Sequence, residues 1–544
     1  MSASSMSASS LLPARLYAFI AVVLITLVAG AASLVNPYWL ILAAITAALS
    51  LVGIYDLTQT RHSLRRNYPI MAHFRAFFEL IRPEIRQYLL ESDSDAIPFS
   101  RAQRSLVYQR AKNVEDKRPF GTELDVYGSG YEWINHSMRP AKIADSDFRV
   151  RIGGKDCTQP YDSSLLNISA MSFGALSANA IRALNTGAKL GGFAHDTGEG
   201  SISRYHRENG GDLIWELGSG YFGCRTADGH FDADKFAAQA KSPQVKMVEL
   251  KLSQGAKPGH GGVLPGAKVT PEIAEARDVP IGVDCVSPAR HSAFSTPLEM
   301  MQFIARMREL SGGKPAGFKF ALGHPWEFFG ICKAMLESGI LPDFIVVDGG
   351  EGGTGAAPLE FTDHIGTPLQ EALLLVHNTL VGLNLRDKIR LGASGKVISA
   401  FDLARNLAMG ADWCNSARGF MFSLGCVQSQ SCHTDHCPTG VATQDLRRQR
   451  ALVVSDKSQR VYHFHRNTLH ALGEMVGAAG LQHPGDLQPR HIVRRVSGNE
   501  IRLLSNLYKF VKPGELLVNP AAHVVYEMYW ARASSHSFDE AGIQ

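Results

Sequence analysis

The sequence predicts an α/β protein in which a (β/α)8 TIM barrel follows an N-terminal two-helix transmembrane hairpin. Three observations carry this prediction. Two long uncharged apolar runs come first, short apolar runs then alternate with helical patterns, and glycine-rich loops follow several of these short runs. The chain has 544 residues, 45% apolar and 19% charged, which suits one large globular domain with additional segments. The expected parts are a hairpin (1–59), a helical segment (60–150), a barrel domain (151–490) and a C-terminal tail (491–544).

The predicted hairpin consists of the uncharged runs 16–35 and 38–55, separated by Asn36-Pro37. Each run is close to the roughly 20 residues that cross a bilayer core as a helix. A cleaved signal peptide is the alternative, because Ala29-Gly30-Ala31 resembles a cleavage site, but a signal peptide has an apolar region of only about 7–15 residues. Positive residues stay on the cytoplasmic side. Both ends of the hairpin, and the catalytic domain, are therefore expected in the cytoplasm, because these arginines flank the runs: Arg15, Arg61, Arg65 and Arg66.

Residues 60–140 are rich in arginine and aromatic residues, and 73–90 has an amphipathic helical pattern. An amphipathic helix beside the bilayer and a helical lid on the following domain would both give this pattern, and both remain open.

The barrel is predicted from eight apolar runs interrupted by helical patterns over about 260 residues, which favours a closed barrel over an open sheet. The expected strands are 166–170, 192–195, 245–251, 281–285, 317–321, 344–348, 389–393 and 413–417. The clearest expected helices are 177–189, 296–310, 326–338, 367–383 and 398–409.

The net charge and the cysteines bear on the binding partners and on the cellular compartment. The net charge of +4 is small, and no basic block or zinc-finger spacing is present, so nucleic acid is not expected as a partner. Five scattered cysteines are interpreted as free thiols on a reducing, cytosolic side: Cys157, Cys224, Cys285, Cys332 and Cys414.

The other three cysteines, Cys426, Cys432 and Cys437, lie in one segment that ends in Cys-Pro. Soft thiolates so close on an irregular loop suit an iron–sulfur cluster, and three ligands indicate [3Fe-4S]. A zinc site built from Cys432, His433, His436 and Cys437, or ordinary free cysteines, are the alternatives.

Five predicted strand ends carry glycine-rich polar loops, at 169–174, 197–200, 251–259, 348–355 and 393–396. Glycine lets backbone N–H groups approach a phosphate or a flat ring, and the loops after the last two strands of such barrels often hold phosphate. Flavin mononucleotide (FMN) fits this arrangement, with its phosphate near Gly395, Ala417 and Arg418. Lys319, at a strand end, is a candidate for the flavin N1–O2 edge.

These motifs carry a resemblance. Residues from about 163 to 490 resemble the FMN-binding synthase domain of glutamate synthase, in the order Ala-Met-Ser-Phe-Gly, Thr-Gly-Glu-Gly, Lys-x-x-Gln-Gly-Ala-Lys-Pro-Gly, an Asp-Gly-Gly-containing glycine loop, the cysteine motif and Pro-x-Gly-Val-Ala-Thr-Gln. The resemblance implies a (β/α)8 barrel with FMN and a [3Fe-4S] cluster on Cys426, Cys432 and Cys437. The implied FMN-binding residues are Ala170, Met171, Ser172, Lys251, Gln254, Lys319, Gly353, Thr354, Gly355, Gly395, Ala417 and Arg418.

The implied chemistry is reduction of 2-iminoglutarate, formed from 2-oxoglutarate, to glutamate. It needs a hydride donor, a cationic cradle for two carboxylates and an acid. Lys251, Lys257 and Arg277 are the candidate cradle, and Glu199 is the candidate acid. For each, a surface charge or a loop-holding ion pair is the alternative. His195 and Asp196 are expected only to hydrogen-bond at a strand end.

Departures from the family leave the substrate open. No cysteine precedes Cys157, so ammonia is expected free or from a separate glutaminase. His260, Val263 and Lys396 stand where the family has an acid, Gln and usually Gly. No nicotinamide fingerprint is found, so ferredoxin, a reductase subunit or a quinone-linked chain is the expected electron partner. An oxidoreductase acting on another keto or hydroxy acid and an electron-transfer module without amination activity are the alternative functions.

Overall fold

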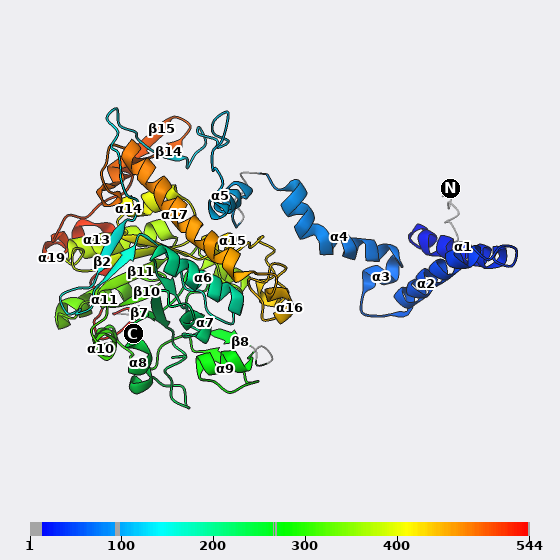
Figure 1. Ribbon diagram of the computed structural model, residues 1–544, viewed down its shortest axis with the longest axis horizontal. Coiled ribbons are helices and arrows are strands. Elements are labelled where there is room, and N and C mark those ends of the chain that lie inside the picture. The colour runs from blue at the N-terminus through cyan, green and yellow to red at the C-terminus, as the bar shows by residue number, and fades with distance from the viewer. Residues whose placement is uncertain (1–12, 93–97, 265, 267–268, 542–544) are drawn as a thin grey trace, which may run out of the picture. The chain divides into compact units, whose positions relative to one another are not determined.

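The computed structural model describes residues 13–92, 98–264, 266 and 269–541. The chain forms two compact units, residues 1–92 and 93–544 (Figure 1).

The N-terminal unit is helical. It contains a 3-10 turn Ala14–Leu16, α1 Tyr17–Ala32, α2 Trp39–Thr58, α3 Ser63–Asn67, α4 Met71–Ile85 and a π-helical turn Arg86–Leu90. Helices α1 and α2 pack against each other, with Thr26 Oγ1 3.2 Å from Ser50 Oγ. Their other faces leave apolar side chains exposed, for example Leu27 at 65% and Leu51 at 68%. By length and composition, the helical segments Ala14–Ala32 and Trp39–Thr58 are long and apolar enough to cross a membrane, as the sequence predicts.

One buried carboxylate joins the end of α2 to α4. Asp56 is fully buried, accepts the backbone N–H of Ile70 at 3.0 Å and contacts His73 Nε2 at 2.9 Å. The amphipathic helix α4 therefore belongs to the same unit as the hairpin.

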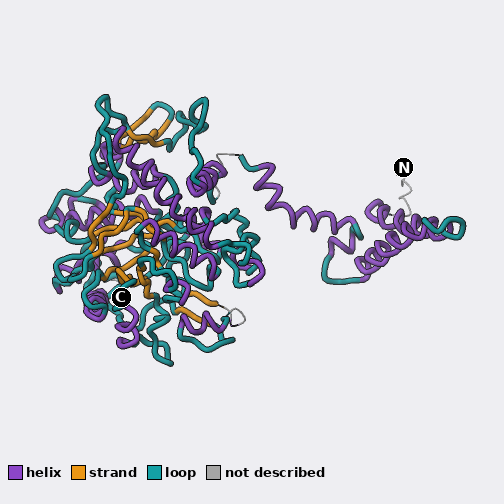
Figure 2. Tube along the Cα trace, in the orientation of Figure 1, coloured by secondary structure: helices purple, strands orange, loops and turns teal. Residues whose placement is uncertain are grey.

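The C-terminal unit contains the predicted closed barrel of eight parallel strands (Figure 2). In chain order these are β4 Leu166–Ile168, β5 His195–Asp196, β6 Leu213–Leu217, β7 Val245–Lys251, β10 Ala316–Phe320, β11 Phe344–Asp348, β12 Arg390–Ser394 and β13 Trp413–Ser416. The barrel closes where β13 pairs with β4, Cys414 opposite Leu166. Seven predicted strands are confirmed, but the prediction at 281–285 is wrong and β6 was missed. Residues 285–287 instead form β9 Cys285–Ser287, which pairs with β8 Gly262–Leu264 outside the barrel.

The barrel interior has two layers, because alternate residues of each strand point inward. The layer near the strand starts is apolar and contains Ile152, Ala194, Ile214, Met247, Phe344, Val346 and Trp413, all buried. Two residues further along β5, β6 and β7, the same inward positions carry Asp196, Glu216 and Glu249. The interior therefore changes from apolar to charged towards the carboxyl ends of the strands.

Helices surround the barrel. They are α6 Ala178–Gly191, α7 Arg204–Arg207, α8 Ala233–Ala240, α10 Pro297–Leu310, α11 Pro325–Ser338, α13 Leu369–Gly382, α14 Ala400–Ala408, α15 Arg418–Ser423 and α17 Val454–Ala478. Shorter insertions at the loops are α9 Pro271–Arg277, α12 Leu359–His364 and α16 Leu446–Gln449, with 3-10 turns at Cys432–Thr434, Pro484–Asp486 and Pro489–His491. Sequence periodicity predicts five of the long helices to within about two residues at each end.

Segments that precede and follow the barrel strands in the sequence pack onto the barrel domain. Helix α5 Arg101–Lys112 packs on α15 and α17, and the hairpin of β2 Arg149–Ile152 with β3 Tyr161–Ser164 contributes Ile152 to the apolar layer. Strand β1 Glu132–Ile134 pairs with β14 Ile492–Ser497, which pairs with β15 Glu500–Leu503. The remaining elements are α18 Leu504–Leu507, α19 Glu515–Val518, a 3-10 turn Pro520–Ala522 and α20 Val524–Tyr529.

Candidate active site

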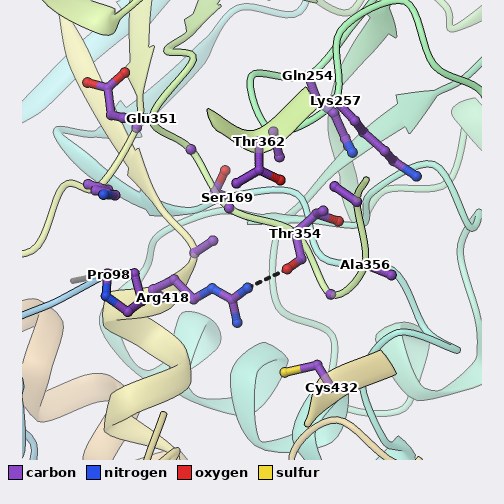
Figure 3. A pocket seen from close by; sticks show the side chains of 18 of the residues that line it. Pro98, Ser169, Gln254, Lys257, Glu351, Thr354, Ala356, Thr362, Arg418 and Cys432 are labelled. Atoms are coloured by element: carbon purple, nitrogen blue, oxygen red, sulfur yellow. Dashed lines mark hydrogen bonds between the residues drawn. The ribbon is translucent and has the colours of Figure 1, made fainter. Parts of the chain in front are cut away.

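A cavity of about 1560 Å³ opens at the carboxyl ends of the barrel strands (Figure 3). Its walls combine the loops after β4, β7, β11, β12 and β13 with the cysteine segment. Thirteen of the predicted site residues line it: Ala170, Gln254, Lys257, Lys319, Gly353, Thr354, Gly355, Gly395, Ala417, Arg418, Cys426, Cys432 and Cys437. One cavity thus contacts the proposed cofactor, substrate and cluster residues together.

The wall formed by the loops after β11, β12 and β13, here called the glycine side, exposes backbone and one guanidinium. Arg418 donates to the Thr354 carbonyl at 2.7 Å, which ties two of these loops together (Figure 3). Gly395 has φ +145°, a conformation that residues with a Cβ rarely adopt. A Cβ on Gly353 would lie 3.5 Å from the Arg418 side chain. Small residues beside a cation leave room for a phosphate, so this wall fits the phosphate of a flavin nucleotide.

Lys396 occupies the strained position next to Gly395. Its φ of +49° is in the left-handed region, which explains why a glycine is usual here in the resembling proteins. The Lys396 ammonium lies 5.9 Å from the ring centre of Phe99, a cation–π contact at the edge of the cavity.

A group of charged residues, here called the charged side, consists of Glu199, Lys251 and Lys257, and of these Lys257 lines the large cavity. Lys251 Nζ donates to Glu199 Oε2 at 3.0 Å and to Gln254 Oε1 at 2.9 Å. These residues line a second cavity of about 30 Å³, a volume that holds about one water-sized molecule. Lys257 and Gln254 line both cavities and therefore connect them.

Electrostatics make Glu199 a carboxylate. Burial alone would raise the pKa of Glu199, but Lys251, with Lys257 and the more distant Arg277, holds that pKa at about 2. Burial lowers the pKa of Lys257. At neutral pH the ionised Glu199 holds Lys251 by a hydrogen bond, and its role as an acid stays a prediction. Lys257, which lines the cavity, is a further candidate proton donor, because burial lowers its pKa.

Three predicted residues, Met171, Ser172 and Arg277, line neither of these two cavities. Arg277 is buried and donates to the Phe173 carbonyl at 3.3 Å. A Cβ on Gly198 would lie 2.8 Å from the backbone nitrogen of Ser172, so that backbone packs directly under the loop that carries Glu199. These residues shape the wall behind the charged side.

Beneath the charged side lies a buried ionic layer that sequence reasoning missed. Lys319 Nζ bonds Glu216 Oε2, and it is 3.9 Å from Glu249 Oε1. Lys251 Nζ is 3.9 Å from the other Glu216 oxygen. Charged residues inside a barrel strand were the available signal, but β6 was not recognised as a strand.

The strand-end residues of β5 differ from each other. Asp196 accepts the Gly198 N–H at 3.0 Å, as predicted, whereas neither ring nitrogen of the buried His195 has a hydrogen-bond partner among the described residues. Burial lowers the pKa of His195 to about 3, so its ring is neutral.

The cysteine segment is covered by the chain that precedes the barrel. Tyr108 of α5 donates to the Cys426 carbonyl at 2.6 Å, and Gln428 donates to the Phe99 carbonyl at 3.1 Å. Phe99 packs edge-to-face on Phe422, 5.4 Å between ring centres. Helix α5 thus covers part of the barrel domain, as a lid would, whereas α4 belongs to the hairpin unit and its place beside a bilayer stays a prediction.

The cysteine segment contains both predicted ligand sets, three cysteines for a cluster and two cysteines with two histidines for zinc. A tetrahedral zinc site has bonds of about 2.0–2.3 Å, so its ligand atoms lie about 4 Å or less apart. Among the described residues, one group of three metal-ligating side chains has its ligand atoms within 4.8 Å of one another. Its members are Asp196, Glu216 and Glu249. Neither the set Cys432, His433, His436 and Cys437 nor the predicted cluster ligands Cys426, Cys432 and Cys437 are gathered in this way.

Comparison with known proteins decides the family. Residues 150–482 match the model of the conserved region in glutamate synthase, which is more than half of the chain. The chain belongs to the glutamate synthase family. This family member is 38% identical over 502 residues to the glutamate synthase large subunit-like protein YerD of Bacillus subtilis (strain 168), covering 85% of this chain and 95% of that protein. It is 34% identical over 361 residues to the archaeal-type glutamate synthase [NADPH] of Thermotoga sp. (strain RQ2), covering 66% and 68%.

Similarity to solved structures is more distant. A mutant flavocytochrome b2 with pyruvate bound gives a TM-score of 0.39 with this glutamate synthase family member at 10% identity, covering 81% of this chain and 86% of the other.

Proposed function

We propose that this protein is an FMN- and iron–sulfur-dependent oxidoreductase that reductively aminates 2-oxoglutarate to glutamate through 2-iminoglutarate. The observation that carries the proposal is that one cavity is lined by the glycine side, by Lys257 and by three cysteines. Family membership supports the reaction class, because the relatives that match over most of the chain are named for glutamate synthase.

FMN would be held on the glycine side. Gly353, Gly355, Gly395 and Arg418 would contact its phosphate, and Lys319 would lie at its N1–O2 edge. When bound, FMN supplies the hydride for the imine carbon. The buried Lys319, paired with Glu216, keeps a positive charge in the floor of the cavity, where it favours an anionic reduced flavin.

Substrate would bind on the charged side. Lys257 contacts both cavities and is the cation that would meet a substrate carboxylate, while Glu199 and Lys251 fix its surroundings. Because burial lowers the pKa of Lys257, its proton is easier to transfer to nitrogen than that of an exposed lysine. Arg277 would position this wall from behind.

A different keto or hydroxy acid is the second candidate substrate, and His260 is the observation that favours it. His260 lines both cavities, and its ring lies 5.1 Å from that of Phe361, edge-to-face. The family has an acidic residue at this position. The side chain of Val263, another of the three departures, lies outside the described part of the chain.

Cys426, Cys432 and Cys437 would hold the [3Fe-4S] cluster and pass electrons to the flavin from ferredoxin or a reductase subunit. The Thermotoga relative is named for NADPH, so a reductase that oxidises NADPH is a suitable partner class. Helices α1 and α2 would anchor the protein in the membrane with the barrel on the cytoplasmic side, and ammonia would come free or from a separate glutaminase.

An anaerobic turnover tests this proposal. The full-length protein in detergent is loaded with FMN and its flavin is reduced chemically; 2-oxoglutarate and ammonium are then added while flavin absorbance and glutamate are measured. We expect flavin reoxidation with one glutamate formed per flavin. A flavin that stays reduced with 2-oxoglutarate but is reoxidised by another keto acid would reject glutamate synthesis and favour the second candidate.

A further inference from the structure

Three carboxylates are buried together in the charged layer of the barrel. Asp196 and Glu249 are 0% exposed and Glu216 is 2% exposed, and one oxygen of each lies within 4.8 Å of one oxygen of the others. They come from the neighbouring strands β5, β6 and β7. The proposed function uses Glu216 only as the partner of Lys319 and gives no role to the other two.

The three carboxylates differ in the number of their oxygens that have a hydrogen-bond partner. Glu216 bonds Lys319, and one oxygen of Asp196 accepts the Gly198 N–H. The other oxygen of Asp196 and both oxygens of Glu249 are buried with no hydrogen-bond partner among the described residues. Lys319 Nζ is 3.9 Å from Glu249, which is an ion-pair distance but too long for a hydrogen bond.

Buried carboxylates without partners are costly, and like charges this close cannot all be ionised. A proton on one of these two carboxyl groups removes one charge, and its O–H can donate a hydrogen bond to an unpartnered oxygen of the other group. We propose that Asp196 and Glu249 share one proton and form a buried proton site, whose occupancy depends through Lys319 on the charge in the large cavity.

The surrounding charges agree with this assignment. The charged groups facing the pair are Glu216 on β6, Lys251 on β7, Lys319 on β10 and Asp348 on β11. Burial, followed by Glu216, raises the pKa of Asp196 to about 7, and burial, followed by Asp196, raises the pKa of Glu249 well above its usual value. The Lys319 ammonium already sits against Glu216 and Glu249, which favours a proton over a metal cation here.

The site has a consequence that rests on the proposed function. Two electrons and one proton reduce a flavin to its anionic form, and the added negative charge beside Lys319 weakens the attraction of that lysine for the carboxylates. A second proton then enters the Asp196–Glu249 pair from solvent. Reduction would therefore take up two protons for two electrons, one on the flavin and one on the pair.

The first test does not need a flavin. Thermal unfolding of the full-length protein is followed from pH 5 to pH 9 for the wild type, for Glu249→Gln and for the control Glu132→Gln. The Glu132 side chain is 7% exposed and pairs with Arg494 outside the barrel. Because the folded state keeps a proton that the unfolded state releases above about pH 4.3, wild-type stability falls as pH rises. Glutamine cannot release that proton. The Tm of Glu249→Gln minus that of the wild type should increase with pH, whereas the control difference should not.

Infrared spectra give an independent readout of the proton. We expect the carbonyl stretch of a protonated carboxylic acid in wild type and Glu132→Gln at pH 7, and its loss in Glu249→Gln. Asp196→Asn provides a second variant if Glu249→Gln does not fold. A pH-independent Tm difference together with no such band would overturn the proposal. So would Mg²⁺ or Ca²⁺ raising the Tm of the wild type but not of Glu249→Gln, because the cluster would then be a cation site.

The second test addresses the link to the cavity. One extra proton per two electrons makes the flavin midpoint potential fall by about 30 mV more per pH unit. We expect this additional slope in the wild type and its loss in Glu249→Gln. Equal slopes would reject the link through Lys319. If the protein binds no flavin, the proposed function fails, while the stability and infrared measurements still decide whether the proton is shared.

Discussion

The two sides of the barrel mouth are built differently. The glycine side relies on backbone: Gly353, Gly395 and the carbonyl of Thr354, fixed by Arg418. The charged side relies on side chains from different strands that hold one another, such as Glu199 with Lys251. A wall made of backbone has a fixed shape, which suits a rigid cofactor that stays bound. A wall made of interlocked charges can respond when a substrate or a proton arrives.

Removing a cluster ligand should have the largest effect on activity. It should also show that the cluster can be lost while both sides of the cavity stay intact. We expect Cys432→Ser to lose the iron and the cluster absorbance while FMN remains bound, because a hard hydroxyl oxygen does not replace a soft thiolate. Turnover with the external electron donor should fall by more than the roughly 10- to 100-fold typical of changes around metal ligands. Iron analysis and flavin absorbance check this, with Cys332→Ser, a buried cysteine of α11, as the control. Retained iron would disprove the ligand assignment.

Lys257→Ala tests the charged side alone. A charge-assisted hydrogen bond contributes about 1.5–3 kcal/mol, so kcat/KM for the keto acid should fall by roughly 10- to 100-fold. Flavin affinity should stay unchanged, because Lys257 belongs to the charged side and not to the glycine side that would hold the phosphate. Steady-state kinetics and flavin titration measure both, and the exposed Lys388 gives a control, Lys388→Ala. Unchanged turnover would show that the cradle assignment is wrong.

The difference between the glycine side and the charged side also explains which parts of the site the sequence could predict. The glycine side and the cysteines are contiguous motifs, and their residues line the cavity as expected. The ionic layer depends on pairs such as Glu216 with Lys319, which lie 103 residues apart and meet only when the barrel closes. Strand β6, Leu-Ile-Trp-Glu-Leu, was missed because its inward Glu216 makes it look amphipathic. The segment 281–285 was mistaken for a strand because Ile281, Val283 and Cys285 alternate, but Ile281 and Val283 are exposed in a turn and Cys285 begins β9 outside the barrel.

Glu199→Gln should reduce stability in a pH-dependent way. The pKa of Glu199 is lowered to about 2 in the folded protein, so its ion pair stabilises the fold above about pH 4.3 and that stability is lost as pH falls towards 2. The shift corresponds to about 3 kcal/mol, and we expect about 2 kcal/mol because the side chain is 25% exposed and partly screened.

Chemical denaturation at pH 7 and pH 3 measures this effect. The variant should be less stable than the wild type at pH 7, and the gap should shrink at pH 3. This trend is opposite to that expected for Glu249→Gln, so the acid of the charged side and the acid of the buried ionic layer would be distinguished by the sign of their pH dependence. An equal gap at both pH values would mean that Glu199 is not held by the lysines.

Gly395→Ala should have the smallest effect and should test whether the glycine side works through backbone shape. A Cβ at Gly395 would lie 3.5 Å from its nearest neighbours, so space is available and the cost arises from φ +145°. That strain is about 1 kcal/mol, which predicts roughly fivefold weaker FMN binding if the loop relaxes away from the phosphate. Gly339→Ala is the matched control, because Gly339 caps α11 at φ +69° with nothing within 4 Å of its Cβ. The control should lose similar stability but keep its FMN affinity. Equal loss of affinity in both variants would mean that general destabilisation, and not the shape of this loop, governs FMN binding.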